Sequence, residues 1–115
     1  MASDRMRRVD EAVRQVLSDA VAHDLQDPRI GFVTMTSVKT SSDLRHARVY
    51  VSVLGTEEER ADTLAGLSSA HGALQRRLAR ELRMKRTPTL EFLYDDTTDR
   101  AMRLEAIIER EVDEA

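Results

Sequence analysis

Residues 68–95 read SSAHGALQRRLARELRMKRTPTLEFLYD, and the fold can be built outward from this stretch. An alanine and a glycine come first, at Ala70 and Gly72, and we expect a bend there because glycine weakens a helix. An arginine-rich helix follows, up to about residue 84, with a leucine at every fourth position of its buried stripe. These leucines are Leu74, Leu78 and Leu82. After Pro88, a short strand alternates apolar and polar side chains.

Positive charge is concentrated in the same stretch. Residues 72–88 carry five arginines and one lysine against a single acid, Glu81, so their net charge is +5, while that of the whole chain is −3. Arg77 has an obvious acidic partner, because Glu81 follows it by one helical turn. The arginines that a helical wheel places nearly opposite the leucines are Arg76, Arg80 and Arg83.

These unpaired arginines predict an anionic partner, because like charges on one helix face lower folding stability. A solvated face that only keeps the protein soluble is the alternative interpretation. Nucleic acid is the favoured partner. Because aromatic residues make up only 3% of the chain, we expect backbone contacts and shape recognition instead of base stacking.

The composition indicates a single globular domain. A chain of 115 residues with 41% hydrophobic and 34% charged residues can bury one core. It has no cysteine, which excludes disulfides and zinc–thiolate sites. No apolar run approaches the roughly 20 residues of a membrane span, and the basic N-terminus lacks the apolar region of a signal peptide. We therefore expect a cytoplasmic protein that binds no membrane.

The N-terminal part of the chain predicts a helix. Apolar residues at spacings of three and four form one stripe over residues 3–25. Ser3 or Asp4 can cap this helix. Its predicted stop is Asp27-Pro28, because the residue before a proline is pushed out of the helical region.

A β-hairpin is predicted next. β-forming residues occupy positions 30–39, and valines alternate strictly over positions 47–53. The polar turn at 41–43 connects the two strands and makes them antiparallel. Gly55 ends the second strand.

Further elements complete the order. Thr56 and Glu59 form a capping box at the start of another helix. Its predicted inner face holds Ala61, Leu64, Ala65 and Leu67. The strand after the basic helix has Leu90, Phe92 and Tyr94 on one side. A final acidic helix is then predicted, with apolar positions Met102, Leu104, Ile107, Ile108 and Val112.

Catalytic and metal-binding patterns are missing from the sequence. It contains neither a phosphate-binding glycine loop nor a serine in a nucleophile elbow. The histidines lie on different elements without ligand spacing; they are His23, His46 and His71. Three acids near the third strand suit turns and helix caps; they are Asp95, Asp96 and Asp99. We therefore expect no enzyme, no metal and no cofactor.

The element order resembles a type II KH domain, and the details resemble the bacterial ribosome-binding factor A family. The segments that carry this resemblance cover nearly the whole chain: 25–29 (LQDPR), 42–44 (SDL), 47–51 (ARVYV), 70–72 (AHG) and 86–92 (RTPTLEF), with Asp95. Ordinary KH domains hold the nucleic-acid backbone with a GxxG loop between two helices. This chain has Ala70-x-Gly72 there, which is the replacement found in that family.

The resemblance implies an α+β fold in which a three-stranded mixed sheet carries helices on one face. We assign residues 1–96 to the KH-like domain and residues 97–115 to an acidic helical tail. The resemblance also implies a non-catalytic assembly factor for the immature small (30S) ribosomal subunit. Such a factor acts late in 16S rRNA maturation, near the 5′ end and the decoding region, and is linked to growth in the cold. We expect a monomer.

The resemblance assigns the helix kink to Ala70 and Gly72. The predicted RNA-binding residues combine the basic helix and its following loop with basic residues elsewhere: Arg76, Arg77, Arg80, Arg83, Lys85, Arg86, Arg7, Arg8, Arg45 and Arg48. Two other functions stay open. One is a protein-interaction module that docks another assembly factor through its acidic helices, and the other is an RNA-processing enzyme.

Overall fold

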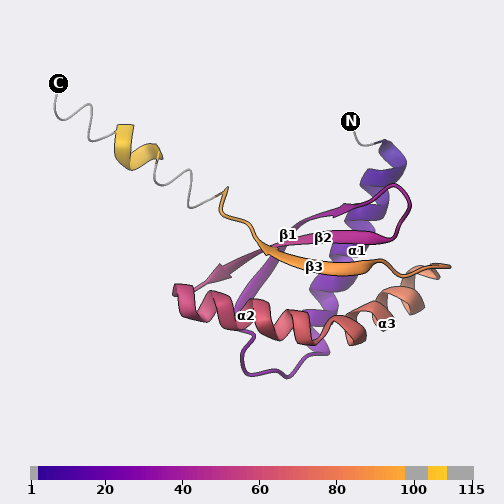
Figure 1. Cartoon of the computed structure of the whole chain (residues 1–115), viewed down its shortest axis with the longest axis horizontal. Helices are drawn as coiled ribbons and strands as arrows, with labels where there is room; N and C mark the ends of the chain where they lie inside the picture. The colour runs from indigo at the N-terminus through magenta and orange to yellow at the C-terminus, as the bar shows by residue number, and fades with distance from the viewer. Residues whose placement is uncertain (1–2, 98–103, 109–115) are drawn as a thin grey trace.

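The computed structural model describes residues 3–97 and 104–108. Its elements follow the predicted order (Figure 1): α1 (Asp4–His23), β1 (Phe32–Thr40), β2 (His46–Leu54), α2 (Glu57–Ser69), α3 (His71–Leu82) and β3 (Thr89–Tyr94). The strands form one sheet with β2 in the centre. β1 and β2 pair as an antiparallel hairpin, whereas β3 runs parallel to β2, so the sheet is mixed as expected.

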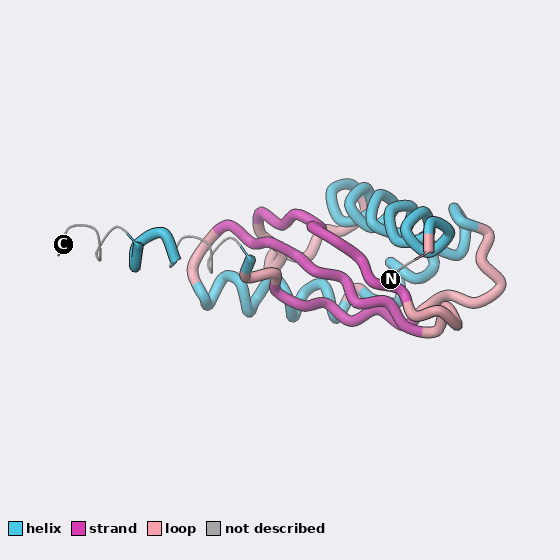
Figure 2. Tube along the Cα trace, turned by 90° about the horizontal axis from the view of Figure 1, so that it is seen from above, coloured by secondary structure: helices cyan, strands magenta, loops and turns pink. Residues whose placement is uncertain are grey.

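One face of the sheet is buried and the other is open. The buried side chains of the central strand are Ala47, Val49, Val51 and Val53. Arg48 and Tyr50 point to the open face, because side chains alternate along a strand. α1 packs against β1 and α3, and α2 packs against β3, so the helices cover the buried face (Figure 2). The largest fully buried side chains of this core are Leu17, Leu67, Leu74 and Leu78.

Helix α1 begins at its predicted cap but ends earlier than predicted. The Ser3 hydroxyl accepts a hydrogen bond from the N–H of Met6. The predicted apolar stripe is confirmed by the buried side chains Val13, Val16, Leu17 and Ala20. The helix ends at His23 instead of continuing to residue 25. The following residues turn instead, and the Asp27 carboxylate accepts the N–H of Arg29 at 2.9 Å.

Helix α1 also covers part of the free edge of β1. The Asp10 carboxylate accepts the N–H of Thr40 at 2.9 Å, and the Arg14 guanidinium donates to the carbonyl of Met35 at 3.4 Å. Unpaired backbone groups on an edge strand invite pairing with other chains. These two contacts therefore protect the edge.

The capping box of α2 is confirmed, but its predicted inner face is only partly right. The Thr56 hydroxyl accepts the N–H of Glu59, and the Glu59 carboxylate accepts the N–H of Thr56. Leu67 is buried and Leu64 is half-buried, as predicted. The predicted Ala61 and Ala65 are exposed, and the side that faces inward holds Thr63 and Gly66 instead.

The loop before β1 explains this difference. The Thr63 hydroxyl donates to the carbonyl of Arg29 at 3.3 Å and accepts the N–H of Gly31 at 3.2 Å. Gly66 lies against Ile30, so close that an added Cβ would be 2.7 Å from the Ile30 Cγ1 atom. Helix α2 therefore turns a hydroxyl and a glycine toward the loop, and hydrophobic periodicity does not reveal such a face.

The predicted bend between the second and third helices is confirmed, and it lies at Ala70. This residue has φ −86° and ψ 3°, and its N–H is shared by the carbonyls of Gly66 and Leu67. Gly72 is already the second residue of α3. Helix α3 ends at Leu82, two residues before the predicted end, because Arg83 takes the left-handed conformation with φ 49° and ψ 43°.

The C-terminal segment is described only in part. The Asp95 carboxylate accepts hydrogen bonds from the N–H and the hydroxyl of Thr97, as expected for a turn that breaks the strand. Residues 104–108 are helical, and their large apolar side chains are exposed; these are Leu104, Ile107 and Ile108. The predicted positions outside the described residues are Asp99, Met102 and Val112. The boundary between the domain and the tail stays a prediction.

We expect Gly66→Ala to lower the free energy of unfolding by about 1 kcal/mol. The overpacking against Ile30 costs about 1–3 kcal/mol, and the better helix propensity of alanine offsets about 1 kcal/mol of this cost. Chemical denaturation followed by circular dichroism measures the change. Gly72→Ala is the matched control. A Cβ there would lie 3.6 Å from Arg76 Nη1, an ordinary contact distance, so this variant should be more stable than the wild type. Equal changes in the free energy of unfolding for the two substitutions would contradict the close contact between Gly66 and Ile30.

Candidate nucleic-acid interface

Helix α3 presents two exposed arginines on the side away from the core. Leu74 and Leu78 are buried against the other elements. Arg76 and Arg80 lie on the opposite side of the helix and are exposed. Neither forms an ion pair with any residue in the ranges 3–97 and 104–108. Both guanidinium groups can therefore neutralise phosphates without first breaking an internal ion pair.

Arg77 is placed differently from these neighbours. Its side chain is only 17% exposed, and it donates to three carboxylates: Glu81 of the same helix, and Asp19 and Asp24 at the end of α1. These hydrogen bonds, first the one to Glu81 and then the one to Asp24, raise the pKa of Arg77 well above its ordinary value. Arg77 therefore joins α3 to α1. The sequence alone indicated only its Glu81 partner.

A basic loop continues the cationic surface beyond α3. Its exposed cations, which make no ion pair with other described residues, are Arg83, Lys85 and Arg86. The Gln75 side chain holds this loop to α3 by donating to the carbonyl of Pro88 at 2.9 Å. The next residue, Thr89, donates its N–H to the carbonyl of Arg45 at 2.8 Å. The basic loop and the loop of the β-hairpin therefore lie side by side.

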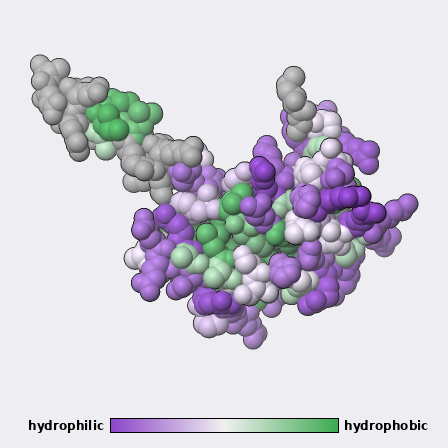
Figure 3. Space-filling view, viewed as in Figure 1, coloured by the Kyte–Doolittle hydropathy of each residue, from purple (hydrophilic) through white to green (hydrophobic). Residues whose placement is uncertain are grey.

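The N-terminal and hairpin arginines of the predicted set are all exposed. Arg7 pairs with Asp4 at 3.0 Å, and Arg45 lies 3.9 Å from Asp43. Such exposed pairs are weak and can be exchanged for a phosphate. Arg8 has no ion pair with the described part of the chain. Figure 3 shows hydrophilic surface over the end of the molecule where α1 begins and α3 ends, and apolar residues over the strands.

Arg48 belongs to a separate place, the open face of the sheet. Its register partner on β1 is Lys39, and its register partner on β3 is Glu91. Lys39 is exposed and was not among the predicted residues. The strand register identifies it, and that register could have been derived from the valine alternation and the turn. Lys39, Arg48 and His46 line a hollow of about 540 Å³.

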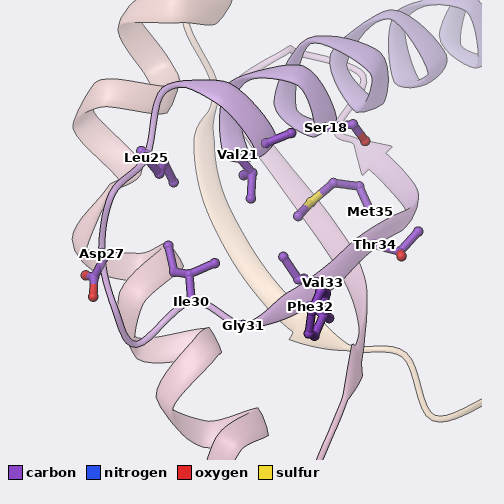
Figure 4. A pocket seen from close by; sticks show the side chains of 11 residues that line it. Ser18, Val21, Leu25, Asp27, Ile30, Gly31, Phe32, Val33, Thr34 and Met35 are labelled. Atoms are coloured by element: carbon purple, nitrogen blue, oxygen red, sulfur yellow. The ribbon is translucent and has the colours of Figure 1, made fainter.

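A second hollow, of about 420 Å³, lies between the end of α1 and β1 (Figure 4). Most of the residues that line it are apolar, and they include Val21, Ile30 and Met35. The one charged residue in the lining, Asp27, forms an ion pair with Arg29 at 2.7 Å, and this guanidinium lowers the pKa of the carboxyl. The lining holds no cation. This hollow therefore does not suit a phosphate.

The structure assembles no metal centre from its described residues. No group of three or more histidine, cysteine, aspartate or glutamate side chains there can hold a metal ion. His23 and His71 each place Nδ1 next to a backbone carbonyl of their own segment, of Asp19 and Ser68 respectively. No helix among these residues is long and apolar enough to cross a membrane.

Comparison with known proteins identifies the family. The family model described as Ribosome-binding factor A matches residues 5–108. The chain belongs to this family. It is 43% identical to Ribosome-binding factor A of Thioalkalivibrio sulfidiphilus over 96% of this chain and 85% of that protein. It is 47% identical to that of Halorhodospira halophila over 95% of this chain and 89% of that protein. The predicted resemblance is confirmed.

Solved structures of the family share the fold. The crystal structure of ribosome-binding factor A from Thermus thermophilus matches with a TM-score of 0.69 and 34% identity, over 77% of this chain and 94% of that chain. A homology model of the Thermus thermophilus ribosome binding factor A, as fitted into the cryo-EM map of a 30S complex, matches with a TM-score of 0.62 and 35% identity, over 75% of this chain and 90% of that chain. The predicted type II KH-like α+β fold is confirmed.

We expect Arg77→Met to lower the melting temperature by several degrees. The substitution leaves the carboxylates of Asp19 and Asp24 facing the end of α1, where negative charge is unfavourable, without their shared cation. Differential scanning calorimetry measures the shift. Arg76→Met removes the same charge from the exposed side of α3 and should leave the melting temperature unchanged. Equal shifts in the two variants would show that Arg77 is not part of the fold.

Proposed function

We propose that this protein binds the immature small ribosomal subunit through the arginine face of α3, defined as Arg76 and Arg80. It thereby assists late maturation of the 16S rRNA, including processing of the 5′ end, and catalyses no reaction itself. The observation that carries the proposal is that both arginines are exposed and make no ion pair with any described residue. Support comes from the relative in Thermus thermophilus that was fitted into the map of a 30S complex.

The family resemblance extends this proposal to the cellular setting. The protein acts as a monomer in the cytoplasm, near the 5′ end and the decoding region of the rRNA, and cells need it most in the cold. Co-sedimentation with small ribosomal subunits from a cell lysate tests the central claim. If the protein is instead a protein-interaction module or a processing enzyme, the small-subunit fraction will not contain it in stoichiometric amount.

Neutralisation of phosphates supplies most of the affinity in this mechanism. Each guanidinium that replaces a counterion on the rRNA backbone releases that counterion, so binding weakens steeply as salt rises. Arginine suits this role because its planar fork bonds two phosphate oxygens at once. The chain as a whole has a net charge of −3, but acids more than about 8 Å from the contact are largely screened at physiological salt.

The start of α3 favours close approach of an RNA backbone. Its N-cap is Ala70, which has no side chain for capping, and its first turn contains no acid. By contrast, the first turn of α2 carries Glu57, Glu58 and Glu59 behind a full capping box. Phosphates bind at helix N-termini because the free N–H groups and the helix dipole attract anions. Gly72 adds no side chain that would keep a phosphate away.

We expect Arg76→Gln combined with Arg80→Gln to reduce the salt dependence of subunit binding. If each arginine contacts one phosphate, the slope of log Kobs against log salt concentration becomes less steep by about 2. Co-sedimentation of purified protein with small subunits over a series of salt concentrations measures the slope.

A charge-matched variant controls for net charge in this experiment. Ala61→Glu combined with Ala65→Glu changes the net charge by the same amount, on the exposed side of α2. It should leave the salt slope at its wild-type value. A slope that changes equally in both variants, or in neither, would contradict the assignment of the α3 face.

Gly72→Ala tests the close approach separately from charge. We expect this variant to bind small subunits severalfold more weakly, because the added methyl group stands at the start of α3, although the variant folds more stably than the wild type. The same co-sedimentation assay measures its affinity. Wild-type affinity would show that Gly72 is not needed for the approach of RNA, and would leave the arginine face untouched.

A further inference from the structure

Two cations face each other across the strands on the open face of the sheet. Lys39 of β1 and Arg48 of β2 are register partners, and both are exposed. Like charges directly opposite each other destabilise an antiparallel pair. Neither forms an ion pair with a residue that the structure describes, although Glu91 is the register partner of Arg48 on β3. An anion bound between the two cations would remove this repulsion.

The same two cations line the hollow of about 540 Å³. The rest of its lining comes from the hairpin and from β3, and consists of Thr40, Ser41, His46, Ala47, Thr89 and Glu91. The lining holds two permanent cations against one acid. A lysine that acts as a point charge and an arginine that offers a planar fork together suit a phosphodiester group. An aqueous hollow beside them gives the phosphate room to enter.

This second cationic surface and the arginine face of α3 lie on opposite sides of the molecule. The helices cover the sheet face that buries Val49 and Val51, and Arg48 points to the other face. Helix α3 turns Leu74 toward this core and Arg76 away from it. The core therefore separates the two sets of cations.

We propose that the Lys39–Arg48 hollow is a second phosphate-binding site, and that the protein bridges two RNA segments, one on each side. A duplex is a stiff, convex cylinder, so it contacts one of the two opposite faces and leaves the other free. A protein with a cationic surface on each face holds two RNA helices at a set distance. This inference rests on the proposed function, because it takes folded rRNA as the ligand.

The test uses two short RNA duplexes of the same sequence, one with a donor dye and one with an acceptor dye. Energy transfer between them at low salt reports bridging, and sedimentation velocity gives the number of duplexes bound to each protein molecule. We expect the wild type to bind two duplexes and to produce energy transfer. A wild-type protein that binds one duplex and produces no transfer would overturn the inference.

Three variants with the same change in net charge assign the two sites. Lys39→Glu should bind one duplex and produce no transfer. Its fold should be at least as stable as the wild type, because the introduced carboxylate lies opposite Arg48. Arg76→Gln combined with Arg80→Gln should also bind one duplex, at the other site. Ala61→Glu combined with Ala65→Glu should bridge as the wild type does.

Energy transfer that persists in the Lys39→Glu variant would contradict the assignment of the Lys39–Arg48 hollow as a second phosphate-binding site. The proposed function has its own readout, the affinity for small subunits, which depends on the arginine face whether or not bridging occurs. If the wild type does not bridge two duplexes, but the α3 substitutions change subunit binding as predicted, only this inference is refuted. Wild-type subunit binding by the α3 variant would remove the proposed function.

Discussion

The parallel pairing of β3 with the central strand β2 requires the chain between them to cross from one end of the sheet to the other. A tight hairpin cannot make this connection, which needs a crossover of a dozen or more residues that is usually helical. α2 and α3 together form this crossover, and the break at Ala70 allows both to pack on the same face of the sheet. Because β3 starts beside the hairpin loop, the basic loop after α3 ends next to Arg45. The positions of the cations on α3 and in the basic loop depend on this crossover.

Carboxylates decide which arginines of α3 belong to the fold and which are available for a ligand. Arg77 reaches Asp19 and Asp24 across the helix–helix contact, and it fixes how α3 lies on α1. Arg76 is adjacent in the sequence, but it points to solvent on the other side of the helix. An arginine-rich helix in a net-acidic protein can therefore serve two purposes. One arginine orients the helix, and its neighbours form the surface that this orientation exposes.

The N-termini of the two crossover helices also differ in their caps and in the charge of their first turns. α2 fills its first turn with glutamates and closes its capping box, which satisfies the free N–H groups internally. α3 begins at an alanine with no side-chain cap and no acid. In the proposed function, a phosphate is therefore repelled at the start of α2 and accepted at the start of α3. In that proposal, this contrast directs an RNA backbone to the arginine face, and it uses local backbone chemistry more than net charge.

Local patterns in the sequence were sufficient for much of this protein. Alternating valines predicted the hairpin, a leucine at every fourth residue predicted the buried stripe of α3, and Thr56 with Glu59 predicted a cap. Each of these signals links residues that are neighbours in the chain, so a single sequence contains the whole pattern. The exposed side of α3, with Arg76 and Arg80, followed from the same helical period.

Other features were decided only by the tertiary structure. The inner face of α2 depends on Gly66 fitting against Ile30, and the role of Arg77 depends on two aspartates more than fifty residues earlier. These contacts join residues far apart in the chain, and their energy depends on distances of a few ångström that no periodicity encodes. The sequence by itself therefore determined the elements and their amphipathic faces, while packing decided which polar side chains are committed to the fold and which are free to bind.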